Sequence, residues 1–265
     1  MRGIIKEHIG FGWQIWTLSL LELKAMCKGS ILGFAWLALK PLITLLMFWF
    51  TMLAGIRASS MIAGFPRFDF MLAGFIAWFF MRDMIIGGAK CIRKNSQYVT
   101  KISFPISVVF TFTAISKFIV HMGLVILMYI YLILAGYRPS VYHIQFFLYA
   151  ALMFLFFLAC SWTLGSWSVF SRDFQNFVSS IVTGVFWVSG VLWDSRNVDN
   201  RWLHYFVMLN PVNFFVNGYR KTFLYQEWFW RDGKELLIFF AEFLIVLCIG
   251  AYNYKKTRKD MADVL

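Results

Sequence analysis

The chain has 265 residues, of which 60% are hydrophobic, 20% are aromatic and 14% are charged, and its mean hydropathy is +0.68. A soluble domain would hold about 25% charged residues, so this composition excludes a water-soluble globular protein and indicates an integral membrane protein. The net charge of +12 is the excess of Lys and Arg that sets membrane topology and meets anionic headgroups, so we expect membrane lipids rather than nucleic acid as partners.

Residues 1–30 predict an amphipathic helix that lies in the membrane interface. Trp13 and Trp16 recur with other apolar residues at helical spacing, while Lys24 and Lys28 fall largely on another face. Such a helix buries its apolar face at the acyl boundary and turns its lysines toward the headgroups. A simple anchor that only fixes the topology is the alternative.

The remainder of the chain, residues 31–265, predicts one transmembrane domain without internal repeats. A helix needs about 20 mainly apolar residues to cross a bilayer, and six stretches approach this length, although the fifth is short and the sixth contains Glu242. Most Lys and Arg outside the spans and the long outer segment fall on the side of the two termini, which places both termini in the cytoplasm. The expected spans are 31–56, 68–88, 106–134, 146–170, 177–193 and 236–252.

Several cations fall inside the expected spans, and some of them follow a tryptophan by one helical turn. An ionisable group near the middle of a bilayer costs about 2.5–3.5 kcal/mol on insertion scales, so each one needs a reason. A Trp and a cation at positions i and i+4 are suited to a cation–π contact. These residues either line a polar path for a charged substrate or snorkel and pair between helices. The set is Trp36, Lys40, Trp78, Arg82 and Lys117.

The segment KCIRKNSQYVTKISFP, residues 90–105, separates the second and third expected spans. It carries four cations and no acid, and Pro105 closes it. Residues 90–104 therefore predict a basic, mostly polar helix of about four turns on the cytoplasmic side. A positive-inside topology signal is the simpler alternative.

Residues 194–233 form a long outer segment between the fifth and sixth expected spans, and its middle predicts a short helix. Asn210 is suited to the N-cap and Pro211 to the first helical position, and Tyr219 continues the helical spacing of apolar residues. The stretch is too short to cross the membrane and Arg220 follows directly, so a re-entrant or interfacial half-helix fits best. Such backbone is tolerated at membrane depth only where protein or a cavity surrounds it.

Motifs of nucleotide binding and covalent catalysis do not occur in the sequence. The stretch GGAKCIRK lacks the second glycine and the Lys-Ser/Thr pair of a Walker motif, and HExxH, GxSxG and GxGxxG are not found. The four cysteines are scattered without a CxxC spacing, so neither disulfides nor a zinc site is expected. We expect no catalytic residue, metal or cofactor in this chain, and the energy for uphill movement would come from a partner or an ion gradient.

Five stretches together resemble the membrane subunit of bacterial ABC exporters for cell-surface polymers, and they follow the order of that family. They are KAMCKGSILGFAWLALKPLI (24–43), VTKISFPIS (99–107), SRDFQNFVSSIVTGVFWVSGVLWD (171–194), LNPVNFFVNGYR (209–220) and RKDMADVL (258–265). The KISFPIS and RDFQ…LWD stretches are most similar to the wall teichoic acid export permeases of Gram-positive bacteria, and O-antigen and capsule exporters share much of the pattern. Cys27, Lys28 and Met261 depart from the residues that are common in the family.

The resemblance implies an all-α integral membrane protein with six transmembrane helices, an N-terminal amphipathic helix and re-entrant half-helices between spans five and six. It implies two permease copies and two nucleotide-binding ATPase subunits in the bacterial plasma membrane, with ATP and Mg bound by the ATPases only. The chain is then no enzyme by itself but a subunit of a translocase. The implied substrate is a teichoic acid linked to a polyprenyl diphosphate.

The same resemblance implies roles for individual segments. Residues 90–104 become a coupling helix that docks in a groove of the ATPase, while the N-terminal helix braces the ATPase and gates lipid-linked substrate from the inner leaflet. The half-helices cap the outer end, where Arg220 and Lys221 meet phosphates. The residues expected to couple to the ATPase are Arg93, Lys94, Asn95, Gln97, Tyr98 and Lys101.

Other functions stay open at this point. An O-antigen, a capsular polysaccharide or a small hydrophobic drug would be a different cargo for the same architecture. A stand-alone ion-driven transporter would need no ATPase, but the sequence shows neither the inverted repeats nor the paired intramembrane acids that count in its favour. A membrane-bound acyl- or glycosyltransferase would need a cluster of His or carboxylate residues, which the sequence does not show either.

Overall fold

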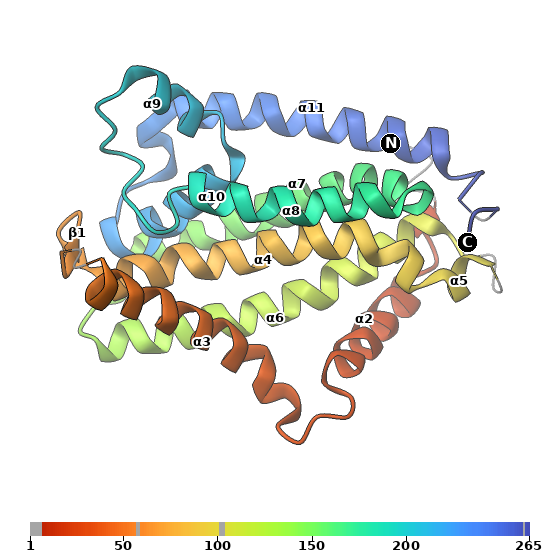
Figure 1. Cartoon of the computed structure of the whole chain (residues 1–265), viewed down its shortest axis with the longest axis horizontal. Coiled ribbons are helices and arrows are strands. Elements are labelled where there is room, and N and C mark those ends of the chain that lie inside the picture. Colours follow the sequence, from red (N-terminus) through yellow and green to blue (C-terminus); the bar gives the residue numbers. More distant parts are fainter. Residues whose placement is uncertain (1–6, 57–58, 101–103, 262) are drawn as a thin grey trace.

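A computed structural model describes residues 7–56, 59–100, 104–261 and 263–265. It is an elongated bundle of helices in which the C-terminus and α5 (Ser96–Thr100) lie at one end, here called the terminal end (Figure 1). A small hairpin lies at the opposite end, the hairpin end, where β1 (Met61–Ile62) pairs antiparallel with β2 (Phe65–Pro66). The predicted all-α membrane fold is confirmed.

Among the described residues, five helical segments are long and apolar enough to cross a membrane. They contain α3 (Trp36–Phe50), α4 (Arg67–Lys94), α6 (Ile106–Leu134), α7 (Gln145–Phe170) and α11 (Gly233–Thr257). The fifth expected span is α8 (Arg172–Val188), which runs beside them in Figure 1 but has only 17 residues. At 1.5 Å per residue it reaches about 25 Å, less than the thickness of a hydrocarbon core of about 30 Å. The expected count of six spans is therefore not confirmed in the described part of the chain.

α4 is the central helix of the bundle because other helices cover most of its surface. It packs against α6, α7, α8 and the short helix α10 (Pro211–Arg220). A Cβ added at Gly88 would lie 2.3 Å from the hydroxyl oxygen of Ser161 on α7. The glycine thus lets α4 and α7 approach closely, as small residues do between helices in membranes.

α3 is the least covered of the five candidate spans. In its most apolar stretch of 18 residues only 6% is buried within the chain, compared with 72% in the corresponding stretch of α4. A 3-10 turn (Gly33–Ala35) precedes it and a π-helical turn (Thr51–Gly55) extends it. Exposed apolar residues such as Met47 and Phe50 give this helix a lipid-compatible outer surface.

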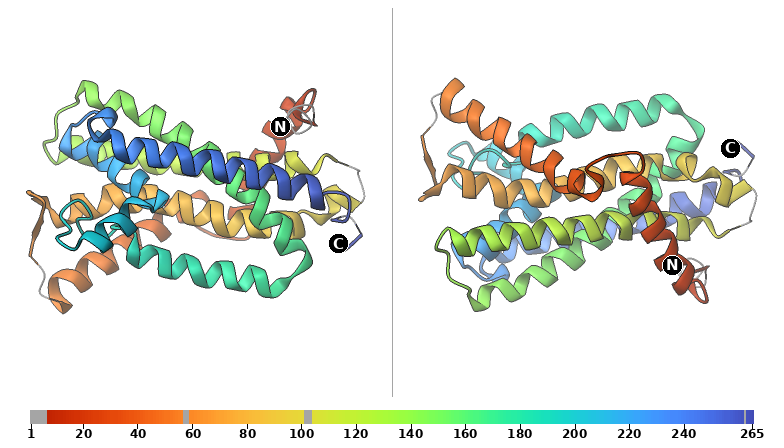
Figure 2. Two further views of the ribbon diagram at one scale, coloured as in Figure 1. Left: turned by 90° about the horizontal axis from the view of Figure 1, so that it is seen from above. Right: turned by 90° about the horizontal axis from the view of Figure 1, so that it is seen from below.

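α2 (Gly12–Cys27) and α3 form the two arms of a V whose opening faces α6 (Figures 1 and 2). α2 packs on α6, while Trp13 and Trp16 point away from the bundle and are exposed, as are Lys24 and Lys28. The predicted N-terminal helix is therefore present, although residues 1–6 of the predicted segment lie outside the described residues. The buried side chains of α2 are Ile15, Ser19, Glu22 and Cys27.

The helix expected over residues 90–104 is divided differently in the structure. α4 continues without a break to Lys94, so the first five residues of the segment belong to a spanning helix. Asn95 ends α4, and only the short helix α5 follows. The Gly87–Gly88 pair does not interrupt α4 because neighbouring side chains cover both glycines. Lys101 lies outside the described residues.

The outer segment folds around two short helices, of which one is buried and one is exposed. α10 begins as predicted, with Pro211 in its first turn and the Asn210 side chain accepting a hydrogen bond from the amide of Val212 at 3.0 Å. The helix is buried along its whole described length except near its start, so protein surrounds this half-helix. A π-helical turn (Lys221–Tyr225) extends it. α9 (Arg201–Met208) precedes it and is largely exposed.

Candidate functional site

Three of the predicted intramembrane cations converge on one pocket between helices. Lys40 of α3, Arg82 of α4 and Lys117 of α6 line a cavity of about 250 Å³, together with Trp36. We call this cavity the basic pocket. Trp78, the fifth residue of the predicted set, does not line it.

The structure confirms one predicted cation–π contact and corrects the other. The Lys40 ammonium lies 5.8 Å from the centre of the Trp36 ring. The Arg82 guanidinium lies over Phe79, at 5.5 Å, instead of over Trp78. Trp78 is buried against Phe186 of α8, with ring centres 5.4 Å apart. Sequence spacing alone does not show that Trp78 turns toward α8 while Arg82 turns toward the pocket.

The carboxylate that lines the basic pocket does not balance the charge of its cations. Arg82 forms an ion pair with Asp83 at 2.9 Å, and both side chains are more than a third exposed. Asp83 also lines the pocket. Among the described residues no carboxylate forms an ion pair with Lys40 or Lys117. Three cations and one carboxylate leave a net charge of +2 on the lining.

A glycine on α4 makes room for the Lys117 side chain. A Cβ added at Gly87 would lie 2.2 Å from Cε and 2.8 Å from Nζ of Lys117. The lysine stem thus packs directly on the backbone of Gly87, which directs the ammonium toward α4. The sequence offers the Gly-Gly pair as the only sign of this arrangement, and sequence reasoning missed it.

Two apolar cavities adjoin the basic pocket. One, of about 260 Å³, shares Pro41, Phe79 and Leu124 with it, and the other, of about 390 Å³, shares Leu37, Val120 and Leu124. The first lies between α3, α4 and α6, and the second between α2, α3 and α6. A charged and an apolar surface are therefore continuous here.

The residues expected to contact an ATPase mostly make contacts within the chain. Arg93 donates to the carbonyl oxygens of Ser168 and Val169 at the end of α7, at 3.1 and 2.6 Å. Lys94 forms an ion pair at 2.8 Å with Glu22, whose side chain is only 5% exposed. These two cations join the end of α4 to α7 and to α2.

Two more members of that set contact the chain itself, whereas Lys94 keeps about half of its side chain exposed despite its ion pair. The Asn95 side chain donates to the carbonyl of Cys91 at 3.0 Å and closes α4. Tyr98 packs against Phe104 and Phe112. Gln97 is exposed, and so is Lys90 on the last turns of α4. The exposed residues here thus include Lys90, Lys94 and Gln97, while Arg93, Asn95 and Tyr98 mainly contact the chain itself.

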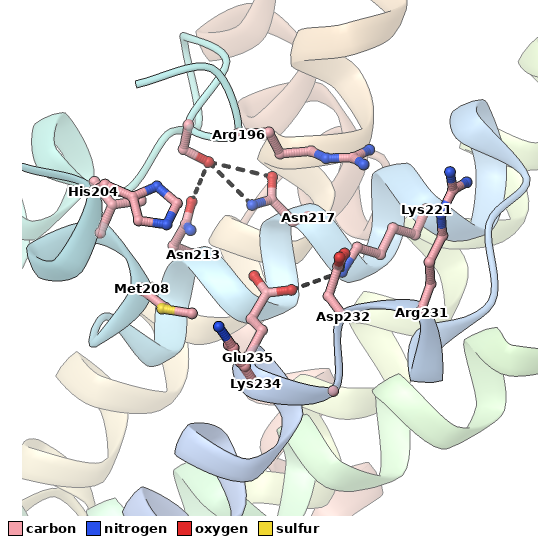
Figure 3. A pocket seen from close by; sticks show the side chains of 13 residues that line it. Arg196, His204, Met208, Asn213, Asn217, Lys221, Arg231, Asp232, Lys234 and Glu235 are labelled. Carbon is pink, nitrogen blue, oxygen red and sulfur yellow. Dashed lines mark hydrogen bonds and ion pairs between the residues drawn. The ribbon is translucent and has the colours of Figure 1, made fainter. Parts of the chain in front are cut away.

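The outer segment contains a polar pocket of about 490 Å³ between α9, α10 and the start of α11 (Figure 3). The Ser195 hydroxyl donates to the Asn213 side chain at 2.6 Å and accepts from Asn217 at 3.0 Å. Lys221 forms ion pairs with Asp232 at 2.7 Å and Glu235 at 2.6 Å. We call this cavity the outer pocket. Its polar groups largely satisfy one another.

An arginine at the rim of the outer pocket is held by a carboxylate. Arg196 lies 2.9 Å from Glu227. Burial alone would lower the pKa of Arg196, but Glu227, Tyr225 and Asp232 together outweigh burial and raise this pKa above its ordinary value. The residue therefore stays positively charged at any physiological pH.

The expected phosphate contacts of Arg220 and Lys221 are corrected by the structure. Arg220 is fully buried, donates to the carbonyls of Gly190 and Val191 at 2.8 Å each, and lies 3.6 Å from the centre of the Phe70 ring. Lys221 is buried in its ion pairs. Tyr219 is buried as well and bonds to His121 at 2.6 Å. The two cations hold the half-helix in the bundle and do not present free charge to the outside.

These features define a multi-pass membrane protein with a basic pocket between its helices and a buried half-helix at one end. Residues 13–224 match the model of the ABC-2 type transporter family. The chain belongs to this family, and it has the architecture of a permease subunit.

Curated relatives resemble the chain over almost its whole length. The O-antigen export system permease protein RfbA of Myxococcus xanthus is 25% identical over 98% of both chains. Two proteins of the same name from Klebsiella pneumoniae are each 20% identical over 98% of both chains.

Proposed function

We propose that this chain is the transmembrane subunit of an ATP-driven exporter that moves a lipid-linked polysaccharide of the O-antigen class across the bacterial plasma membrane. The observation that carries the proposal is the full-length similarity to O-antigen export permeases combined with the ABC-2 family match. Wall teichoic acid is the second candidate, favoured by the KISFPIS and RDFQ…LWD stretches. The relatives give the polysaccharide more support.

The chain shows no nucleotide-binding motif, so the energy would come from a separate ATPase subunit that binds ATP and Mg. We place the ATPase at the terminal end, which faces the cytoplasm in this proposal. Exposed cations gather there, at the end of α4 and of α11, as the positive-inside rule requires. A complex of two permease copies and two ATPases follows from the same proposal.

The docking surface for the ATPase would centre on the exposed residues Lys90 and Gln97. Arg93 would transmit movement, because its bonds to the α7 carbonyls tie the docking loop to a spanning helix. The variant with Lys90→Glu and Gln97→Glu should lose the co-purifying ATPase while keeping the thermal midpoint of the permease. Arg93→Ala should lower the thermal midpoint. An ATPase that stays bound to the double variant would place docking elsewhere.

The cargo is tested with the purified complex of this chain and the ATPase encoded beside it. ATP hydrolysis is measured with lipid-linked O-polysaccharide, with lipid-linked teichoic acid and with the lipid carrier alone. Stimulation by the O-polysaccharide only is the expected result. Stimulation by teichoic acid only would establish the second candidate, and a chain that never binds an ATPase would refute the exporter and favour a stand-alone transporter.

A further inference from the structure

The basic pocket and its two apolar neighbours form one surface with two chemical parts, and Leu124 of α6 lines all three cavities. We propose that this surface binds a lipid diphosphate, with the diphosphate group in the basic pocket and the long isoprenoid chain along α3 and α6. The inference rests on the proposed function, because it identifies which part of a lipid-linked substrate this chain holds.

The charge of the pocket matches a diphosphate better than a monophosphate. The lining carries three cations and one carboxylate, a net charge of +2, and a diphosphate that links a lipid to a sugar carries two negative charges. A lipid monophosphate diester carries one. Lys117 and Lys40 have no acidic partner among the described residues, so both ammonium groups are available for phosphate oxygens, with which they form charge-assisted hydrogen bonds.

The order of polar and apolar residues along the helices matches the orientation of a lipid. On α4, Leu72 and Ile76 of the apolar cavity precede Arg82, and on α6, Met128 follows Lys117. The two helices are antiparallel neighbours, so the apolar part lies nearer the hairpin end on both. A lipid bound here would point its head toward the terminal end and its chain toward the hairpin end.

The pocket lies in the terminal half of the bundle, close to the middle of the membrane span. Lys117 lies 11 residues after the start of α6 and Arg82 12 residues before the end of α4, or about 16–18 Å along the helices. α4 as a whole spans about 42 Å, close to a bilayer with its headgroups. Met26 of α2 also lines the pocket. A diphosphate held here would therefore lie inside the bundle, deeper than the headgroup layer of the leaflet at the terminal end.

The pocket is accessible from the side. α3 forms one wall and is largely uncovered by the rest of the chain, and the second apolar cavity lies between α2, α3 and α6 inside the V. A lipid chain therefore has a lateral route to the pocket from the membrane. The Gly87 gap and the Trp36 ring hold two of the three cations in place before a lipid arrives.

The inference is tested by lipid binding to the complex of permease and ATPase in nanodiscs. A fluorescent sugar linked to a polyprenyl diphosphate is the probe, and the competitors are the same sugar linked to a polyprenyl monophosphate of equal chain length, inorganic pyrophosphate and phosphatidylglycerol. We expect the unlabelled diphosphate lipid to compete at least about tenfold better than the monophosphate. Lys117→Gln should weaken probe binding about tenfold or more, which is the effect of losing one charged hydrogen bond.

Matched variants separate the pocket from general charge effects. Lys117→Arg should keep most of the binding, and Lys255→Gln, which removes an exposed lysine of α11, should leave it unchanged. If Lys117→Gln does not fold, Lys40→Gln on the exposed helix α3 replaces it, with the same expectation.

Three results would overturn the inference. They are equal competition by the monophosphate and the diphosphate, competition by pyrophosphate or phosphatidylglycerol as strong as by the diphosphate lipid, and unchanged binding in Lys117→Gln. Failure of the proposed function looks different, because a wild-type complex would then move no lipid-linked polymer. A complex that exports polymer but gives any of the three results would refute only the pocket assignment.

Discussion

Replacing Arg220 by methionine should destabilise the protein strongly, because the guanidinium holds three parts of the chain together. Its side chain is fully buried and bonds to the carbonyls of Gly190 and Val191 at 2.8 Å and of Phe70 at 3.3 Å. A hydrogen bond from a charged group contributes about 1.5–3 kcal/mol, and a buried carbonyl left without a donor costs about 1–3 kcal/mol. Relief of the cation's own desolvation offsets part of this loss, so we expect a net loss of about 3–5 kcal/mol.

The assay is the thermal midpoint of the purified permease in detergent, followed by intrinsic fluorescence. A loss of this size corresponds to a fall of roughly 10 °C. Arg220→Lys should lie between the wild type and Arg220→Met, since an ammonium reaches fewer of the carbonyls. Arg201→Met is the matched control, because Arg201 is exposed on α9, and it should change stability by less than about 0.5 kcal/mol. If Arg220→Met leaves the midpoint unchanged but abolishes export, the structural role of Arg220 is refuted. The expectation that Arg220 contacts a substrate phosphate would then be favoured.

Three further predictions follow from packing and hydrogen bonds. Glu22→Gln removes the ion pair with Lys94 and should speed the cleavage of α2 by trypsin several-fold; an unchanged cleavage rate would show that the pair does not hold α2. Gly88→Ala places a Cβ against α7 and should lower the thermal midpoint by several degrees, whereas Gly184→Ala, with nothing within 4 Å, should not; equal midpoints would contradict the packing. Tyr254→Phe removes the hydroxyl that accepts a hydrogen bond from the backbone amide of Ser107 and donates one to the Glu7 carboxylate. It should lower the free energy of unfolding by about 1 kcal/mol, measured by the same melting assay. A change below about 0.3 kcal/mol would count against those bonds.

The sequence predicted the elements whose signals are local. Long apolar runs identified the spanning helices, and the Asn210–Pro211 pair marked the start of α10 because both signals act within one turn. Trp36 and Lys40 meet as expected from their i, i+4 spacing. These features depend on neighbouring residues only, so they are visible without the fold.

What the sequence could not show depends on contacts between distant segments. Arg220 followed a predicted half-helix and resembled a free cation, but the carbonyls that bury it come from residues 30 and 150 positions away. Arg93 and Lys94 looked like an outward basic patch, while their partners lie on α7 and α2. A charge run gives no sign of which cations turn inward when the acceptors are backbone carbonyls of another helix.

The short length of α8, the fifth expected span, has a physical reason that the sequence shows in part. The stretch Arg172–Asn176 begins α8 with polar and charged residues, and its apolar part starts only at Phe177. After Val188 the chain leaves the helix for the loop whose carbonyls hold Arg220. The helix thus ends where the half-helix needs backbone acceptors, a requirement that no local pattern reveals.

The central claim is tested most directly by polymer movement in proteoliposomes that contain this chain and its ATPase partner. Lipid-linked O-polysaccharide is placed in the membrane and its appearance on the side opposite the ATPase is followed with a lectin or an antibody to the polymer. The account predicts appearance that requires ATP and stops when the ATPase is inactivated. Movement that proceeds without ATP or without the ATPase, or no movement with an active complex, would contradict it.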